Sequence, residues 1–228
     1  MFTDTTKTTK TTKTTNETKF TDADIIDKKI EVPQANNGPK IEYSDSPVLT
    51  DGLLSIGSSP VFNSEECKKI IENCIDELWQ SVKVYGSGNI HRAKMQKVRG
   101  NLSEHPFNLF KEAIITANNQ LYNFNLLGML DKDYPQVAKY SKGDFYNLHT
   151  EINPMSLTRK LSFIVILNDE TEYEGGEIEF LNTELNHSET SKIGTMIVFP
   201  SFLTYKIKPV KKGTRYFITG NIHGDSFK

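Results

Sequence analysis

The sequence lacks long apolar runs and any marked excess of one charge. Its 228 residues include 27 Lys and Arg against 29 Asp and Glu, which gives a formal net charge of −2. Such a chain has no overall basic field, so we expect neither nucleic acid nor an anionic membrane as a partner. No run reaches the roughly 18 apolar residues that a membrane-spanning helix needs, so we predict no such helix.

Cysteine is also scarce, and a leader-like segment is missing from the first residues. Only Cys67 and Cys74 occur, within one helical pattern. Seven residues of helix separate them by roughly 10 Å, too far for a mutual disulfide, so we expect both to pack as small apolar side chains. The first residues have no charged start followed by an apolar core. We therefore expect a cytoplasmic protein, or one assembled in the cytoplasm into a virion-like particle.

The first part of the sequence has few apolar residues. Residues 3–19 are built on a repeated Thr-Thr-Lys, and the composition stays polar to Pro47. We predict an extended N-terminal arm over residues 1–47 and one folded domain over residues 48–228. Two interpretations of the arm remain open: a disordered tail, or a segment that docks on a protein partner in a larger assembly. Its anchors would be Ile25, Ile26, Ile30 and Val32.

Helical periodicity marks two segments in the first half of the domain. A short strand is expected at Leu53–Ile56, closed off by Pro60, and a loop at Gly86–Asn89. Asn63 and Glu66 have the spacing of a capping box, ahead of a helix from Glu65 to about Gln80. A second amphipathic helix is expected from about Pro106 to Leu121. Both helices are expected to pack against the rest of the domain.

After Phe124 the pattern changes to short strands separated by turns. The expected strands are Leu126–Leu130, Val137–Tyr140, Phe145–His149, Lys160–Leu167, Glu177–Phe180, Thr195–Phe199, Tyr205–Ile207 and Arg215–Ile222. Short strands at regular spacing are typical of a sandwich or jelly roll. The predicted fold class is thus mainly β with flanking helices (α+β): a double-stranded β-helix, or jelly roll, preceded by two packing helices and the arm.

Five motifs occur in a fixed order between Tyr140 and Gly224. They are Tyr140–Glu151, Arg159–Asn168, Tyr173–Glu177, Gly194–Ser201 and Pro209–Tyr216. In this order and spacing the chain resembles the 2-oxoglutarate and Fe(II)-dependent oxygenases, in particular the prolyl 4-hydroxylase-like branch. The resemblance implies a jelly roll, Fe(II) and 2-oxoglutarate as cofactors, and hydroxylation as the reaction.

The resemblance also implies a metal site in which this sequence departs from the family pattern. His149 and Glu151 match the family's His-x-Asp pair, with Glu in place of Asp, and Tyr205 stands where the second metal histidine is expected. A phenol with a pKa near 10 is a poorer ligand than imidazole at neutral pH. Two interpretations follow. Either His149, Glu151 and Tyr205 form an unusual metal site, or Tyr205 fills the place of a metal and hydrogen-bonds Glu151.

The resemblance assigns Arg215 and Tyr140 to the distal carboxylate of 2-oxoglutarate. An arginine fork suits a carboxylate, although Arg215 could instead pair with Glu151 or Glu177. His187 and His223 do not match the family's ligand position, and His91 and His105 carry no motif.

Two functions follow from these departures. The first is a non-catalytic binding or structural subunit of a larger assembly, by analogy a bacteriophage virion component. The second is an active 2-oxoglutarate/Fe(II)-dependent hydroxylase with a His-Glu-Tyr site. The altered ligands favour the first.

Overall fold

A computed structural model describes residues 42–43, 56–82, 90–101, 104–181 and 191–227 of the chain. Apart from Glu42–Tyr43, the predicted arm lies outside these residues. So do Leu53–Ser55 and the predicted loop at Gly86–Asn89. The division of the chain into an arm and a domain at residue 47 therefore stays a prediction.

The two predicted helices are present but shorter than expected. Helix α1 spans Ser64–Glu72, and both halves of its Asn63–Glu66 capping box are formed. It stops before Ile75, whose backbone N–H donates to the Gln96 side chain. This tertiary contact, followed by the 3-10 helix η3 (Asp76–Leu78), replaces the predicted continuation to Gln80. Helix α2 spans Asn108–Ala117 and continues as the π-helical turn η4 (Asn118–Tyr122).

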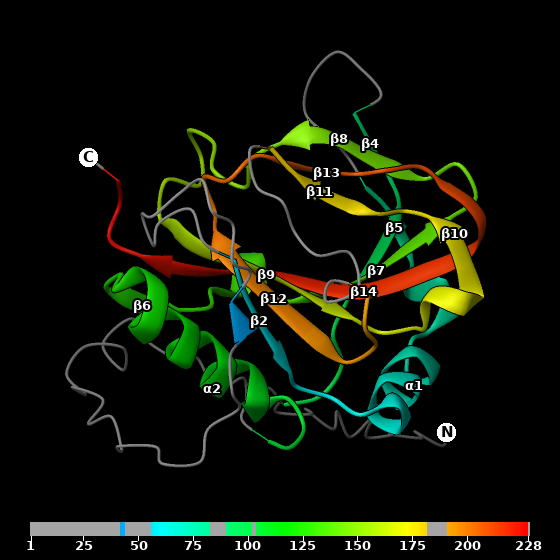
Figure 1. The fold of residues 1–228 in the computed structure, drawn as a ribbon, viewed down its shortest axis with the longest axis horizontal. Helices are drawn as coiled ribbons and strands as arrows, with labels where there is room; N and C mark the ends of the chain where they lie inside the picture. The colour runs from blue at the N-terminus through cyan, green and yellow to red at the C-terminus, as the bar shows by residue number, and fades with distance from the viewer. Residues whose placement is uncertain (1–41, 44–55, 83–89, 102–103, 182–190, 228) are drawn as a thin grey trace, which may run out of the picture. The chain divides into compact units, whose positions relative to one another are not determined.

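Strands make up most of the remaining described structure (Figure 1). They are β1 (Glu42–Tyr43), β2 (Gly57–Pro60), β3 (Gln80–Ser81), β4 (His91–Arg92), β5 (Lys94–Lys97), β6 (Leu126–Gly128), β7 (Gln136–Ser141), β8 (Phe145–His149), β9 (Arg159–Ile166), β10 (Tyr173–Gly175), β11 (Ile178–Phe180), β12 (Thr195–Pro200), β13 (Tyr205–Ile207) and β14 (Val210–Gly224). Two short 3-10 helices, η5 (Asp131–Asp133) and η6 (Glu170–Glu172), lie among them.

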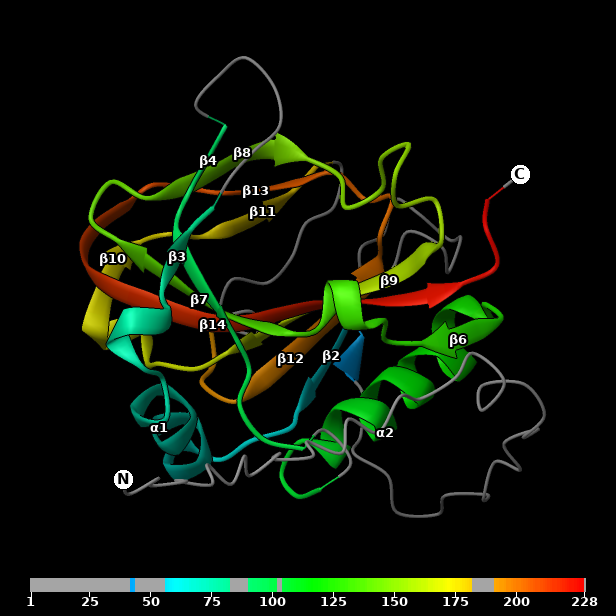
Figure 2. The ribbon, with the colours of Figure 1, turned by 180° about the vertical axis from the view of Figure 1, so that it is seen from behind.

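The strands form two antiparallel sheets. The larger has the order β1-β2-β12-β9-β14-β7-β5-β3, with β6 and β10 also paired to β14, and the smaller has the order β11-β13-β8-β4. In Figure 1 the small sheet lies above the large one, and α1 and α2 lie below; Figure 2 shows the same layers from behind. This arrangement confirms the predicted jelly roll with helices over one face.

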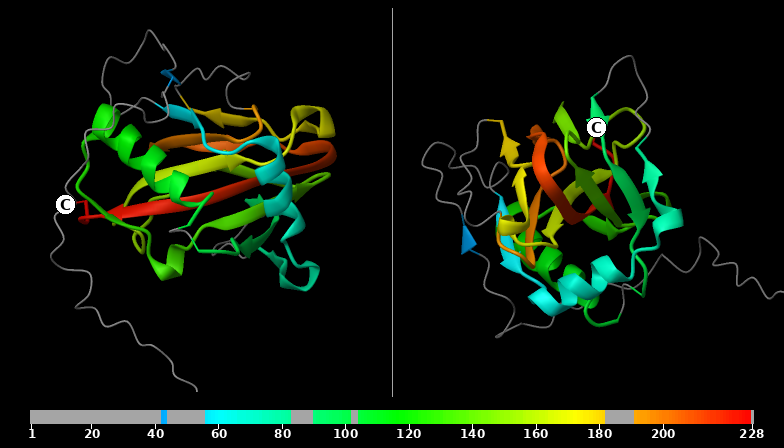
Figure 3. Two further views of the ribbon diagram at one scale, coloured as in Figure 1. Left: turned by 90° about the horizontal axis from the view of Figure 1, so that it is seen from below. Right: turned by 90° about the vertical axis from the view of Figure 1, so that its right-hand side faces the viewer.

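A hydrophobic core fills each of the two gaps between layers. Between the sheets, Tyr140, Ile164, Phe199 and Phe217 are almost fully buried. Beneath the large sheet, the apolar faces of α1 and α2 pack on it through residues such as Cys67 and Phe110. Figure 3 shows both helices on that side of the strands. None of the described helices is long and apolar enough to cross a membrane.

Most strand predictions are confirmed, with several differences at the edges. Of the strand expected at Leu53–Ile56 only Ile56 is described, and it directly precedes β2, whose last residue, Pro60, is paired to Thr195. Strand β14 begins at Val210 and continues through Gly213, where a break was expected; the φ of +70° at this position is one that glycine adopts readily. Strands β3, β4, β5 and β10 were missed because each is too short for alternation to stand out.

Candidate functional site

A β-bulge in β8 gives the site its shape. Tyr205 of β13 lies opposite His149, and Ile207 lies opposite Tyr146. The pairing therefore advances by three residues along β8 and by only two along β13. The extra residue turns Tyr146 and His149 to the same side, where strict alternation would separate them. Their rings stack with centroids 3.3 Å apart. The bulge therefore aims His149 at the space between the two sheets.

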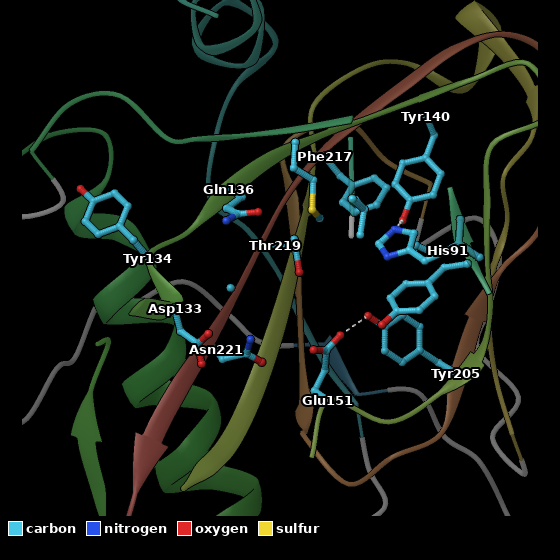
Figure 4. Close-up of a pocket in the computed structure, with 15 residues that line it drawn as sticks. His91, Asp133, Tyr134, Gln136, Tyr140, Glu151, Tyr205, Phe217, Thr219 and Asn221 are labelled. Carbon is cyan, nitrogen blue, oxygen red and sulfur yellow. Dashed lines mark hydrogen bonds between the residues drawn. The ribbon is translucent and has the colours of Figure 1, made fainter. Parts of the chain in front are cut away.

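Glu151 receives hydrogen bonds at both carboxylate oxygens. The Tyr205 hydroxyl donates to Oε1 at 2.7 Å, and Nη1 of Arg159 lies 3.3 Å from Oε2. Burial alone would raise the pKa of Glu151, but His149, Tyr205 and Arg159 outweigh it and leave the pKa lowered. Glu151 is therefore an ionised carboxylate held by its neighbours (Figure 4).

Tyr205 is a neutral phenol in this arrangement. Its side chain is buried, and burial together with the Glu151 charge raises its pKa well above the ordinary value. The proton that it donates to Glu151 would have to be lost before the oxygen could bind a metal as phenolate. The hydrogen bond between Tyr205 and Glu151, one of the two interpretations drawn from the sequence, is thus confirmed as a contact.

His149 keeps one ring nitrogen available. Its Nδ1 lies 2.7 Å from the Asn147 carbonyl, which fixes Nδ1 as the donor. Its Nε2 is buried without a hydrogen-bond partner, 3.4 Å from Glu151 Oε1. Two ligand atoms at a right angle, each roughly 2.1 Å from one ion, lie about 3.0 Å apart. His149 and Glu151 are therefore placed much as two neighbouring metal ligands would be.

The complete set of residues does not fit the family's iron site. A facial site needs three protein ligands with free lone pairs. Tyr205 brings a protonated oxygen that is already engaged with Glu151, and Arg159 occupies the second Glu151 oxygen. Within the described residues no group of three His, Cys, Asp or Glu side chains could hold a metal ion.

Tyr140 and His91 extend the site on one side. The Tyr140 hydroxyl lies 2.6 Å from His91 Nε2, and the His91 ring stacks on Tyr146 with centroids 3.7 Å apart. Burial, and then the nearby His149, lowers the pKa of His91 to about 4. At neutral pH His91 is uncharged, so its ring carries one N–H and one acceptor nitrogen, and the two groups share a single hydrogen bond. Tyr140 therefore has a partner within the protein.

A second set of polar residues, bonded to one another, contacts Glu151 through Arg159. Arg159 makes two hydrogen bonds of 2.7 Å to Asp133, and Asp133 also lies 3.0 Å from Nε2 of the buried His223. Nδ1 of His223 lies 2.8 Å from the Thr158 hydroxyl. His223 is thus bound to Asp133 and Thr158 instead of reaching Glu151 directly. His187, the other histidine considered, lies outside the described residues.

A cavity of about 200 Å³ lies between these groups. Figure 4 shows Glu151, Tyr205, His91 and Tyr140 along one side and Gln136, Thr219 and Asn221 along the other. Asp133 also lines it, so the wall carries two carboxylates. No Lys or Arg belongs to its described lining, which disfavours an anionic ligand there.

Arg215 lines a different cavity, of about 360 Å³, with Tyr173 and Glu177. It pairs with Tyr140 in the β14–β7 register, but its guanidinium donates to the Gly176 carbonyl and its buried Nε has no described partner. Among the described residues it forms no ion pair with Glu151 or Glu177. Arg215 and Glu151 thus line different cavities.

The comparisons with known proteins agree with this fold. Residues 135–223 match the family model described as the 2OG-Fe(II) oxygenase superfamily. A PKHD-type hydroxylase of Prochlorococcus marinus is 38% identical over 88 residues, which are 36% of this chain and 38% of the relative. One of Cupriavidus metallidurans is 31% identical over 88 residues, or 36% and 39% of the two chains. The match thus spans well under half of these curated relatives.

Two solved structures share the fold alone. A Pseudomonas putida prolyl-4-hydroxylase superposes with a TM-score of 0.56 at 18% identity, over 78% of this chain and 95% of that one. A viral collagen prolyl hydroxylase from Paramecium Bursaria Chlorella virus-1 gives 0.52 at 18% identity, over 75% and 96%.

Four residues of the site were not predicted. His91, Asp133, Tyr146 and Arg159 were given no role from the sequence. His91, Ala93 and Met95 do alternate with exposed Arg92 and Lys94, a period-two signal for a strand with His91 facing inward. Tyr146 could not be found this way, because the bulge reverses its alternation.

Proposed function

Given that residues 135–223 make this chain a member of the 2OG-Fe(II) oxygenase superfamily, similar to the prolyl 4-hydroxylases, we propose that it is a non-catalytic, binding member. The observation that carries the proposal is the state of Glu151. One of its oxygens accepts from Tyr205 at 2.7 Å and the other faces Arg159 at 3.3 Å. A metal ion bound through Oε1 would compete with the Tyr205 hydroxyl for that oxygen.

The separation of Arg215 from Glu151 supports the same proposal. The reaction of the family needs 2-oxoglutarate at the metal, and here the two residues line different cavities. Tyr140, the second residue expected at the distal carboxylate, is instead hydrogen-bonded to His91. Glu151, Tyr205 and Tyr140 are therefore bonded to protein groups where a working site would leave them free for metal or 2-oxoglutarate.

An active hydroxylase is the second candidate, and one observation favours it. The buried Nε2 of His149 has no hydrogen-bond partner and lies 3.4 Å from a carboxylate oxygen. Two lone pairs facing each other are unfavourable unless a proton or a cation lies between them. In this second candidate the cation is Fe(II), with 2-oxoglutarate as co-substrate at Arg215.

One experiment separates the two candidates. Purified protein is incubated with Fe(II), ascorbate and 2-oxoglutarate, and bound iron and succinate are measured. We expect substoichiometric iron and no succinate above a protein-free control. One iron per chain together with succinate formation would overturn the non-catalytic assignment.

The role of the arm belongs to the same proposal and rests on the sequence. Residues 1–47 would dock the protein on a protein partner in a multi-subunit assembly, such as a virion. Deletion of residues 1–47 should abolish co-purification with assembled particles and leave the jelly roll folded. Unchanged assembly by the truncated chain would contradict this role.

A further inference from the structure

A second and larger groove opens beside the site cavity. It has a volume of about 1120 Å³ and is formed by η3, β3 and β5. Val82, Met95 and Gln136 line both this groove and the cavity that contains Glu151, so the two spaces lie next to each other. In Figure 2, β3 and β5 lie on the side of the large sheet that faces the viewer.

The floor of the groove is apolar and partly exposed. Its apolar lining residues are Ile75, Leu78, Val82, Met95 and Val98. Leu78 keeps 49% of its surface accessible, so part of this apolar surface is open to solvent. An apolar floor of this kind binds side chains of a partner by removing apolar surface from water.

The rim of the groove is basic. Lys97 is the last residue of β5 and Arg99 follows it by two residues, and both line the groove. Both are exposed, and neither forms an ion pair with any described residue. Among the described residues no Asp or Glu lines the groove, although Asp76 and Glu77 lie nearby on η3. The two cations are therefore available to an external anion.

The cavity beside the groove carries the opposite charge, because the carboxylates of Asp133 and Glu151 line its wall. An acidic side chain would be repelled near that cavity and attracted at the outer rim. A ligand of the groove is therefore expected to carry acidic residues at the rim and an uncharged side chain next to the cavity.

We propose that this groove binds an acidic, apolar peptide segment of a protein partner, held by Lys97 and Arg99 over the apolar floor. The apolar floor is the reason to choose a peptide over a nucleic acid, which would present phosphates to the rim and leave Leu78 and Met95 without apolar contacts. The proposal rests on the binding role proposed above and names the chemistry of its partner.

The test is fluorescence anisotropy with labelled peptides of about 10 residues, roughly 33 Å when extended. The probe alternates Glu and Leu and carries one central Ala. Two reference peptides replace Glu by Gln or by Lys, and a labelled ten-nucleotide single-stranded DNA serves as a fourth probe. Binding to the acidic peptide is expected to be at least tenfold tighter than to the Lys peptide, and to weaken with salt. Equal binding of all three peptides, or tighter binding of the DNA, would overturn the proposal.

Variants locate the binding on the molecule. Lys97→Glu with Arg99→Glu should weaken binding roughly tenfold, since each exposed charge contributes up to about 1 kcal/mol. The matched control is Lys111→Glu with Lys192→Glu, two exposed lysines outside the groove, which should bind as the wild type does. If the double reversal perturbs folding, Lys97→Gln with Arg99→Gln takes its place. Unchanged binding in the folded variant would refute the site. Because this assay contains no iron or 2-oxoglutarate, its result is independent of the succinate test.

Discussion

The Tyr205 hydroxyl donates a 2.7 Å hydrogen bond to Oε1 of Glu151, across the gap between β13 and the end of β8. In the resemblance drawn from the sequence, these two residues occupy positions of metal ligands. Here one is the donor and the other the acceptor of a single proton. This hydrogen bond is the basis for the proposal that the chain keeps the oxygenase fold without its reaction.

Restoring the family's ligands should restore iron binding. In Tyr205→His with Glu151→Asp, an imidazole replaces a phenol whose pKa is raised by burial, and the shorter carboxylate moves away from Arg159. We expect close to one Fe(II) per chain by elemental analysis, against little in the wild type. The control is Tyr205→Phe with Glu151→Asp, which supplies no third ligand. Iron retention by this control would contradict the role of the imidazole.

Removing the Tyr205 hydroxyl alone should destabilise the fold. Tyr205→Phe leaves a buried carboxylate without one of its donors, at a cost of about 1–3 kcal/mol in the free energy of unfolding. Urea denaturation measures the change. Tyr134→Phe is the matched control, since its hydroxyl donates to the Gly100 carbonyl near the surface, and we expect a change within about 0.5 kcal/mol. Equal effects of the two substitutions would argue against a special role for Tyr205.

Stability should fall at acid pH through Asp133 and Glu151. Burial raises the pKa of Asp133, but Arg159 and His223 outweigh it, and the pKa is lowered; that of Glu151 is lowered as well. A depressed folded-state pKa adds stability above the unfolded-state pKa of about 4 and loses it as pH falls through the folded value. Unfolding curves measured from pH 7 to pH 2 should therefore show declining stability below about pH 4.

The Asp133→Asn variant identifies the source of that decline. It removes the partner of Arg159 and should be less stable than wild type at pH 7, by about 3–5 kcal/mol. The difference in the free energy of unfolding between the variant and the wild type should become smaller below pH 4, where the wild-type carboxylate is itself protonated. A difference that stayed constant with pH would show that Asp133 does not carry this dependence.

A dicarboxylate should stabilise the protein through Arg215 without any metal. This guanidinium is buried, has an unpartnered Nε and forms no ion pair with a described residue. Ligand at tenfold its dissociation constant would add about 1.4 kcal/mol. We expect 2-oxoglutarate to raise Tm in metal-free buffer for the wild type and not for Arg215→Met. A rise of equal size in Arg215→Met would place the ligand elsewhere.

The cysteines should be unreactive in the folded protein. Burial is the main cause that raises the pKa of Cys67 to about 12 and that of Cys74 to about 11, and a thiol reacts as its thiolate. Both should modify slowly with a thiol reagent at pH 8 and quickly in denaturant. Rapid labelling of Cys67 in native protein would contradict its packing under the large sheet.

The sequence by itself determined the fold class, the two amphipathic helices and most strands, because period and turn residues are local signals. It also revealed that Glu151 and Tyr205 differ from the family's metal ligands, because only the residue types are needed to compare them with the family pattern. Only the tertiary structure decided what these residues contact. The bulge in β8 turned Tyr146 toward His149, and Arg159 reached Glu151 from the start of β9. Arg215 and Glu151 came to line separate cavities. Such contacts depend on register and on side chains distant in sequence, which no local pattern encodes.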